Sequence, residues 1–175
     1  IRELSNKCSI PVTTTIHGLG IVDENTNLSL KMLGMHGNAA ANYAVQDADL
    51  IIAIGYRFCD RTTGNLKKYA LNAKQAELEG KGGIIHFNID EREFNRVVNS
   101  TLNITGNCKE NLIWLINNIK KENNSNNNEW IDKIIKLKKK HKFTYKLNNL
   151  NEIKTQSVIE TLYKKTKNLD NILIT

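Results

Sequence analysis

The chain has 175 residues, of which 40% are hydrophobic, and this is enough for one globular domain with a piece of another. No run of eighteen apolar residues occurs, which excludes an ordinary membrane-spanning helix and gives no reason to expect a membrane partner. The three cysteines, Cys8, Cys59 and Cys108, show no CxxC spacing. We therefore expect free thiols in a reducing compartment rather than a disulfide framework.

The net charge of +7 is unevenly distributed. Residues 1–106 carry 11 basic and 11 acidic side chains, whereas residues 107–175 carry 14 and 7, and all 14 basic ones are lysines. A lysine-rich tail raises the possibility of nucleic-acid binding. Its lysines alternate with apolar residues at helical spacing and no arginine accompanies them, so we favour a solvated helix face and expect no nucleic-acid partner.

The first elements follow from apolar patterning. We expect residues 1–8 to end a helix and residues 10–15 to form a β-branched strand that breaks at a pair of glycines. Residues 37–49 place alanine and valine at helical spacing, and they lead into the apolar run 50–54. This order predicts a helix followed by a parallel strand that is buried on both faces.

The next stretch repeats the pattern. Residues 66–79 are expected to be partly helical and residues 84–89 to form a strand. A helix over 91–98, a short strand over 102–105 and a helix over 109–120 should follow. The alternation of helices and strands predicts an α/β fold with a doubly wound, mostly parallel sheet.

Composition changes after residue 121. The asparagine-rich stretch 123–128 is predicted to be a linker or an expanded loop. Trp130 and Ile134 then belong to an apolar face on an otherwise lysine-rich helix, and residues 157–167 predict a last helix. The chain finishes in an apolar run, residues 172–175, that indicates a strand.

Three loops follow expected strands, at residues 15–20, 55–64 and 88–90. In open parallel sheets, ligands bind beyond the carboxyl ends of the strands, and glycine lets backbone N–H groups approach a phosphate. The full G-x-G-x-x-G fingerprint is absent, since Gly18-Leu-Gly20 supplies only its first part. These loops therefore fit a nucleotide site and ordinary tight turns equally well.

Charged and polar residues leave similar alternatives open. Arg57, Asp60 and Arg61 share one loop and could grip a diphosphate, with an ion pair holding the loop, or they could form a solvated salt-bridge cluster. His36 precedes an expected helix start, where an anion or a simple cap would fit. The remaining histidines, His17, His86 and His141, are too scattered for a metal site and are expected to be structural. No metal ligand set and no catalytic nucleophile is predicted.

Five segments, taken together and in order, resemble the central domain of acetolactate synthase (acetohydroxyacid synthase) catalytic subunits. They are Val12-Thr-Thr-Thr-Ile-His-Gly-Leu-Gly20, Met32-Leu-Gly-Met-His-Gly37, Ala44-Val-Gln-Asp-Ala-Asp-Leu-Ile-Ile-Ala-Ile-Gly55, Arg57-Phe-Cys-Asp-Arg-Thr-Thr-Gly64 and Gly82-Gly-Ile-Ile-His-Phe87. The last of these is most similar to the fungal, mitochondrial type. The resemblance is strongest over residues 1–120.

The resemblance implies a thiamine-diphosphate enzyme of branched-chain amino acid biosynthesis. Such enzymes decarboxylate pyruvate and join the product to pyruvate or 2-oxobutyrate, using thiamine diphosphate and Mg²⁺ held by regions absent from this chain. Their central domain binds FAD, which takes no part in the net reaction. Homodimers or homotetramers, with a regulatory subunit in some cases, are also implied. The location implied is a mitochondrion or plastid in a eukaryote, with the mitochondrial type favoured, or the cytoplasm of a bacterium.

The same resemblance assigns FAD-binding positions. The flavin nucleotide would be flanked by Thr15, Ile16 and His17, the flavin lined by Leu33, Gly34, Met35 and His36, the ribityl-diphosphate region held by Gly55, Tyr56, Arg57, Asp60 and Arg61, and the adenosine end bordered by Asn88, Ile89, Gly106 and Asn107. The chain departs from the family at Asn88, where an acidic residue is usual. Asparagine can still hydrogen-bond a ribose hydroxyl.

We accordingly expect three regions. Residues 1–121 would be a central FAD-binding domain that lacks its opening strand, 122–150 a linker with a lysine-rich helix, and 151–175 the start of a thiamine-diphosphate-binding domain. Without its flanking domains the chain is predicted to be inactive. The alternative is a non-catalytic nucleotide-binding or interaction module with the same fold.

Overall fold

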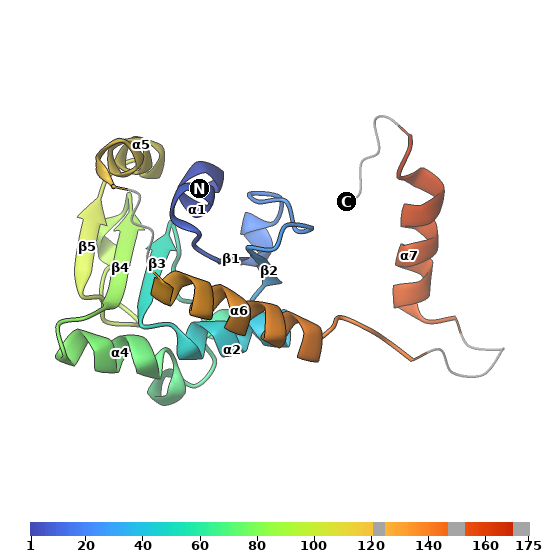
Figure 1. Cartoon of the computed structure of the whole chain (residues 1–175), viewed down its shortest axis with the longest axis horizontal. Helices are drawn as coiled ribbons and strands as arrows, with labels where there is room; N and C mark the ends of the chain where they lie inside the picture. The colour runs from blue at the N-terminus through green and yellow to red at the C-terminus, as the bar shows by residue number, and fades with distance from the viewer. Residues whose placement is uncertain (121–124, 147–152, 170–175) are drawn as a thin grey trace. The chain divides into compact units, whose positions relative to one another are not determined.

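The computed structural model describes residues 1–120, 125–146 and 153–169. It divides into two compact units, Ile1–Lys142 and Phe143–Thr175, which are described separately below. The first unit is an α/β structure with parallel sheets between helices (Figure 1). The predicted fold class is therefore confirmed.

In the described ranges, five strands form two parallel sheets. The smaller sheet pairs β1 (Val12–Thr14) with β2 (Ser29–Met32), and the larger one has the order β3 (Leu50–Ile54), β4 (Gly83–Asn88), β5 (Leu102–Thr105). Every pair is parallel. Strand β2 was not predicted from the sequence. The strands form two sheets, whereas one sheet was expected.

Helices cover both sides of the strands. They are α1 (Arg2–Cys8), α2 (Ala39–Asp47), α3 (Asp60–Thr63), α4 (Leu71–Leu78), α5 (Cys108–Asn118) and α6 (Ser125–Lys140), with short 3₁₀ turns at Ile16–Gly18, Leu66–Lys68 and Glu91–Glu93. Helices α1 and α5 lie on one side, and α2, α4 and α6 lie on the other (Figure 1). The helices predicted at 1–8, 37–49, 66–79 and 109–120 are confirmed.

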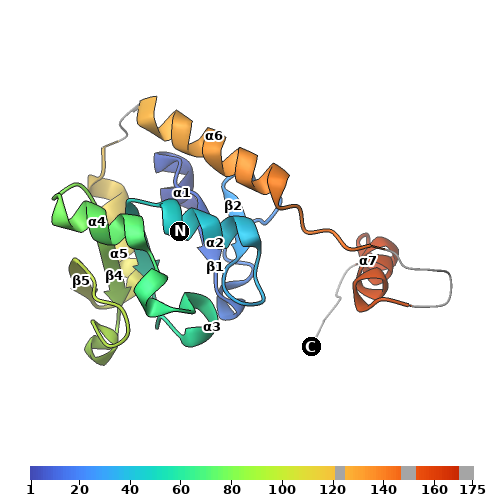
Figure 2. The same cartoon turned by 90° about the horizontal axis from the view of Figure 1, so that it is seen from below.

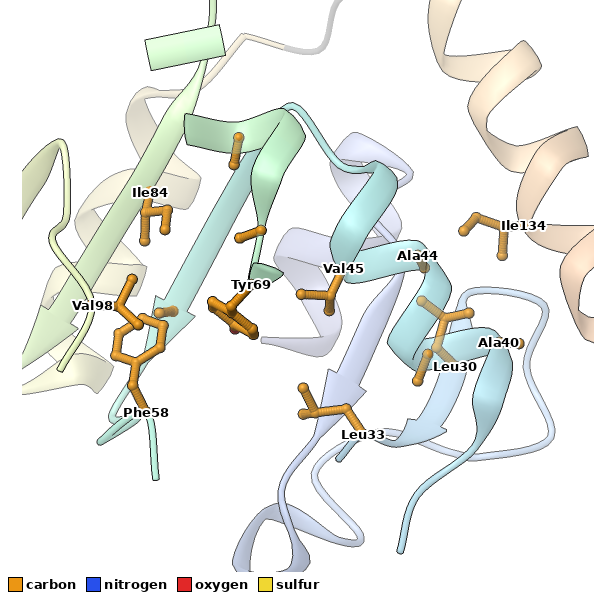
Figure 3. Close-up of a cluster of buried hydrophobic side chains, with 14 residues drawn as sticks. Leu30, Leu33, Ala40, Ala44, Val45, Phe58, Tyr69, Ile84, Val98 and Ile134 are labelled. Atoms are coloured by element: carbon orange, nitrogen blue, oxygen red, sulfur yellow. The ribbon is translucent and has the colours of Figure 1, made fainter. Parts of the chain in front are cut away.

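The main core lies between the larger sheet and helices α2 and α4 (Figure 3). Buried alanines such as Ala41 and Ala73 face this core, and their small size lets the helices approach the strands. Phe58, Tyr69 and Ile84 fill the centre at 1–3% exposure. Close packing at these positions fixes where the loop after β3 begins.

Helix α6 packs against α2 (Figure 2). Its Ile134 is completely buried in the main core, Trp130 and Leu137 pack around it, and Lys133 forms an ion pair of 3.1 Å with Asp47. The helix begins at Ser125, inside the stretch expected to be a linker, so that interpretation is wrong from Ser125 onward. Residues 121–124 lie outside the described part of the chain.

Two further expectations are wrong. Only the turn Glu91–Glu93 forms in place of the helix over 91–98, because Asn95 adopts a left-handed φ of 56° and its side chain accepts a hydrogen bond from the Ser100 N–H at 2.8 Å. Strand β3 is not buried on both faces, since Leu50 is 45% exposed and Ala53 is its one buried member. A cavity beside β3 accounts for this exposure.

The second unit contains helix α7 (Thr155–Thr166), which confirms the helix predicted over 157–167. The Tyr145 hydroxyl donates to the Glu160 carboxylate at 3.1 Å. The strand expected at 172–175 falls outside the described residues. Across the described ranges, no helix combines the length and apolar character needed to cross a membrane.

Candidate functional site

The residues assigned to FAD by resemblance all lie at or just beyond the carboxyl ends of the strands. Strand β1 is followed by residues 15–17, β2 by residues 33–36 and β3 by residues 55–61. Asn88 is the last residue of β4, and Ile89 comes directly after it. Strand β5 is followed by Gly106 and Asn107. Because all the strand pairs are parallel, each sheet gathers these loops at one edge.

The loop after β2 is fixed to the turn that opens α3. The Met35 N–H donates to the Arg61 carbonyl at 2.7 Å, and a Cβ at Gly34 would lie only 2.5 Å from that same oxygen. Gly34 also has a φ of 99°, which favours glycine. Sequence positions 26 residues apart therefore form one continuous surface.

Asn42 of α2 holds the same loop from below. Its side chain accepts from the Gly34 N–H at 2.7 Å and donates to the Gly34 carbonyl at 3.0 Å. The side-chain amide of Asn42 therefore hydrogen-bonds both the backbone N–H and the backbone carbonyl of Gly34. Nothing in the sequence singled out Asn42, because a polar residue within an amphipathic helix gives no sign of such a partner.

The loop after β3 is held by His86 and Phe58. The His86 imidazole lies 2.7 Å from the Tyr56 carbonyl and is completely buried, which confirms its expected structural role and lowers its pKa. Phe58 adopts a φ of 52°, is 1% exposed, and meets the His86 ring edge-on with centroids 5.1 Å apart. Sequence analysis missed Phe58, since its backbone conformation has no sequence signature.

The hydroxyl of Tyr56 is hydrogen-bonded to the Thr62 hydroxyl. Burial raises the pKa of Tyr56, so this phenol stays protonated at neutral pH. The bond joins the two ends of the loop. It thereby supports the segment that carries Arg57 and Arg61.

The ends of β4 and β5 form the third part of the edge. The Gly106 N–H donates to the Asn88 carbonyl at 3.0 Å, while the Asn88 side chain is 6% exposed and accepts from the Asp90 N–H at 3.1 Å. Asn107 caps α5 by accepting from the Lys109 N–H at 2.9 Å. This part adjoins the loop after β3, because a Cβ at Gly55 would lie 4.0 Å from the Cys108 sulfur.

The arginines at this edge are exposed, and no ion pair joins either of them to Asp60 in the described residues. Neither the ion pair nor the salt-bridge cluster considered for this loop is present among the described residues. Asp60 stands in the first turn of α3, and an Arg61 N–H instead approaches the Met35 sulfur at 3.9 Å. Both guanidinium groups remain able to bind an anion.

Three large apolar side chains stand in solvent at the same edge. Ile16 is 66% exposed, Met35 67% and Ile89 72%. Within the described residues, no group of three or more histidine, cysteine or carboxylate side chains could hold a metal. The edge therefore offers glycine loops, free cations and apolar surface, a combination that suits a large anionic ligand with an aromatic ring.

Residues 1–115 match the family model described as "Thiamine pyrophosphate enzyme, central domain". The chain belongs to the thiamine pyrophosphate enzyme family. It is homologous to acetolactate synthase catalytic subunits over most of its length. One relative is the mitochondrial acetolactate synthase catalytic subunit of Saccharomyces cerevisiae, which is 46% identical over 94% of the chain and 24% of its own length.

Two other relatives match nearly the whole chain. The mitochondrial acetolactate synthase of Schizosaccharomyces pombe is 42% identical over 100% of the chain and 26% of its own length, and the acetolactate synthase large subunit of Buchnera aphidicola subsp. Schizaphis graminum is 41% identical over 95% and 28%. The chain thus spans about a quarter of the length of these curated relatives. The relatives of this thiamine pyrophosphate family member include both mitochondrial and bacterial proteins.

Proposed function

We propose that this chain is the FAD-binding central part of an acetolactate synthase catalytic subunit. The observation that carries the proposal is the junction of the loop after β2 with the turn of α3, through Met35 and Arg61. It brings an exposed thioether, a glycine loop and an exposed guanidinium onto one surface. Family membership supports thiamine diphosphate as the cofactor of the whole enzyme.

The side chains along this edge fit FAD in three ways. Arg57 and Arg61 are exposed and would hold the diphosphate by charge-assisted hydrogen bonds. The exposed apolar side chains of Ile16 and Met35 would lose water contact against a flat aromatic ring, which favours binding. Bound FAD would supply that ring and the diphosphate charge.

The adenosine end would rest on the tips of β4 and β5. Asn88 is 6% exposed, its side-chain oxygen accepts a hydrogen bond from the Asp90 N–H, and its amide nitrogen lies 3.5 Å from His86 Nε2. It would therefore shape the loop that borders the adenosine. The capped amino end of α5, an eleven-residue helix, would add its exposed N–H groups and a partial positive charge. These features act together on one anionic nucleotide.

In this proposal the whole enzyme decarboxylates pyruvate and joins the resulting hydroxyethyl group to a second 2-oxo acid. The chain's own residues position FAD and exclude water beside the reaction, and the groups that act on thiamine diphosphate and Mg²⁺ lie elsewhere. The chain alone should therefore form no acetolactate. The mitochondrial relatives support a mitochondrial location, and assembly as a homodimer or homotetramer, with or without a regulatory subunit, belongs to the same proposal.

The proposal is tested by titrating the 175-residue chain with FAD and following the quenching of flavin fluorescence. We expect saturable binding that Arg57→Ala weakens roughly tenfold, which corresponds to the loss of one charge-assisted contact. Lys136→Ala, an exposed change on α6, is the matched control and should bind as the wild type does. Absence of saturable binding, or equal effects of the two changes, contradicts the proposal.

A chimera separates an enzyme part from a non-catalytic module. The part of the chain that matches the S. cerevisiae relative would replace the corresponding segment of that relative. Both the flavin content and acetolactate formation would be measured. We expect a flavin-containing, active chimera. A chimera that retains FAD but forms no acetolactate would favour the non-catalytic nucleotide-binding module.

A further inference from the structure

One lysine of α6 does not lie on the solvated face expected for this helix. Lys138 is partly buried, and its ammonium group donates to the carbonyls of Thr26 and Asn27 at 3.0 and 3.1 Å. In the described part of the chain, no carboxylate lies within ion-pair distance of Lys138. Burial, with a smaller effect from the charge of Lys31, lowers the pKa of Lys138. Two consecutive backbone carbonyls therefore hold a cation that the fold has partly removed from water.

The two carbonyls belong to the turn that leads into β2. The Thr26 N–H and hydroxyl both donate to the Asp23 carbonyl, at 3.2 and 2.9 Å, and the Asp23 carboxylate accepts from the Asn25 N–H at 2.9 Å. The Thr26 carbonyl also accepts from the N–H of Ser29, the first residue of β2, at 3.3 Å. Lys138 stands 112 residues after Thr26 in the chain, and it fixes the amino end of this strand.

Strand β2 connects this turn to the loop assigned to FAD. It has four residues, and Leu33 and Gly34 follow it directly. The Leu33 N–H donates to the Thr14 carbonyl at 3.0 Å, while Asn42 of α2 binds both backbone groups of Gly34. A short strand that is held at both ends transmits a displacement of one end to the other. The position of the Gly34 loop therefore depends on the turn that Lys138 holds.

Helix α6 also fastens α2, which supports the same loop from below. Lys133 forms an ion pair of 3.1 Å with Asp47, and the rings of Tyr43 and His141 stack with centroids 4.9 Å apart. Tyr43 directly follows Asn42, whose side chain holds the loop after β2. Figure 2 shows α6 lying along α2 with its later turns near β2. One helix thus contacts both elements that support this loop.

We propose that Lys138 is a positioning residue for the bound cofactor, a role that rests on the proposed FAD site. It acts through the backbone and not by contact with FAD. Its ammonium group holds the turn before β2, β2 places the Gly34 loop, and the Met35 N–H of this loop meets the Arg61 carbonyl at the α3 turn. A charged donor is required because hydrogen bonds from an ionised group are stronger than those between neutral groups.

The test titrates the 175-residue chain with FAD and compares matched lysine changes on α6. Lys138→Met keeps the length of the side chain but removes its charge and its N–H donors, so it should weaken FAD binding roughly fivefold. Lys139→Met removes the same charge from the adjacent, exposed residue and should bind FAD as the wild type does. Equal weakening by the two changes would overturn the proposal, because the effect would then come from the general attraction between a basic helix and an anionic ligand.

An arginine variant separates positioning from simple packing. Arginine stays charged and can donate to both carbonyls, so Lys138→Arg should keep FAD affinity within about twofold of the wild-type value. An arginine variant that binds as weakly as Lys138→Met would overturn the proposal. Wild-type affinity in Lys138→Met would overturn this role alone, whereas a wild-type chain that binds no FAD would overturn the proposed function and this role together.

Hydrogen exchange measured by NMR follows the loop without FAD. In the chain alone, Lys138→Met should speed the exchange of the Leu33 and Gly34 amides at least about threefold. The amides of Gly55 and Gly83, which bond within the larger sheet, should keep their wild-type rates. Equal acceleration of all four amides would overturn the proposal, because it would show that the change destabilises the whole unit and not this loop.

Discussion

His86 on β4 and Tyr56 in the loop after β3 are joined by a hydrogen bond of 2.7 Å. A carbonyl oxygen can only accept, so Nε2 of His86 carries the proton, and Nδ1 is left deprotonated, buried and without a hydrogen-bond partner in the described residues. Phe58 and Phe94 meet the imidazole edge-on, with centroids 5.1 and 5.0 Å away. One side chain of the sheet thus fixes the backbone of the proposed diphosphate loop.

Replacing His86 by leucine should destabilise the chain by about 1–3 kcal/mol, because the Tyr56 carbonyl would lose its buried donor. The free energy of unfolding in urea is the measurement. His86→Gln keeps a side-chain N–H donor and should lose less. Leucine and glutamine variants of equal stability would show that the hydrogen bond contributes nothing.

The free energy of unfolding should also fall as the solution is acidified below pH 6.5. Burial lowers the pKa of His86 in the folded chain, whereas the unfolded chain keeps a value near 6.5, so the unfolded state binds the extra proton first. The stabilisation from neutral His86 is complete above about pH 6.5 and is lost as pH falls toward the folded pKa. Urea midpoints from pH 7.5 to 5 would show this loss, and His86→Gln should flatten it. If the urea midpoint of His86→Gln falls with pH as steeply as that of the wild type, other groups cause the loss of stability.

Asp90 titrates in a separate window. The Arg92 side chain, 2.8 Å away, holds the pKa of Asp90 at about 2, below its usual value near 4. Any contribution to stability is therefore present above about pH 4 and is lost only as pH falls toward 2. The two windows do not overlap, so a transition between pH 6.5 and 5 does not report on Asp90.

Gly34→Ala should separate the loop after β2 from the α3 turn. The new Cβ would lie 2.5 Å from the Arg61 carbonyl, and alanine disfavours a φ of 99°, so we expect a loss of at least about 2 kcal/mol together with weakened FAD binding. Gly80→Ala is the control, because its φ is 67° but nothing lies within 4 Å of the added Cβ. That change should cost about 1 kcal/mol. Equal urea midpoints for the two variants would contradict the close contact at Gly34.

The larger sheet could be predicted because its strands are apolar runs ended by turns. Strand β2 could not, since Lys31 within it adopts a φ of 64°, which breaks the alternation of a strand. The helix expected over 91–98 failed for a related reason. Asn95 turns the chain through a side-chain hydrogen bond, a local competition that apolar spacing does not reveal.

The candidate site shows the same limit. Glycine placement and the family resemblance indicated the loops, and the structure positions each at a strand end. Two residues that fix those loops, Asn42 and Phe58, could not be identified, because a helical asparagine and a positive φ leave no sequence signature. His86 was expected to be structural, but its partner Tyr56 lies 30 residues away and could not be predicted.

Helix α6 should behave as part of the first unit's core. Ile134 is completely buried between α6 and α2, so Ile134→Ala should lower the free energy of unfolding by about 2–4 kcal/mol through lost contacts and a residual cavity. Ile159→Ala on α7 is the matched control, because this isoleucine is 62% exposed in the second unit and its loss should change stability by less than about 0.5 kcal/mol. Both variants would be compared by urea unfolding followed through Trp130 fluorescence. Equal, small effects would mean that α6 is dispensable for the core, and a domain boundary near residue 121 would then be preferred to one at Lys142.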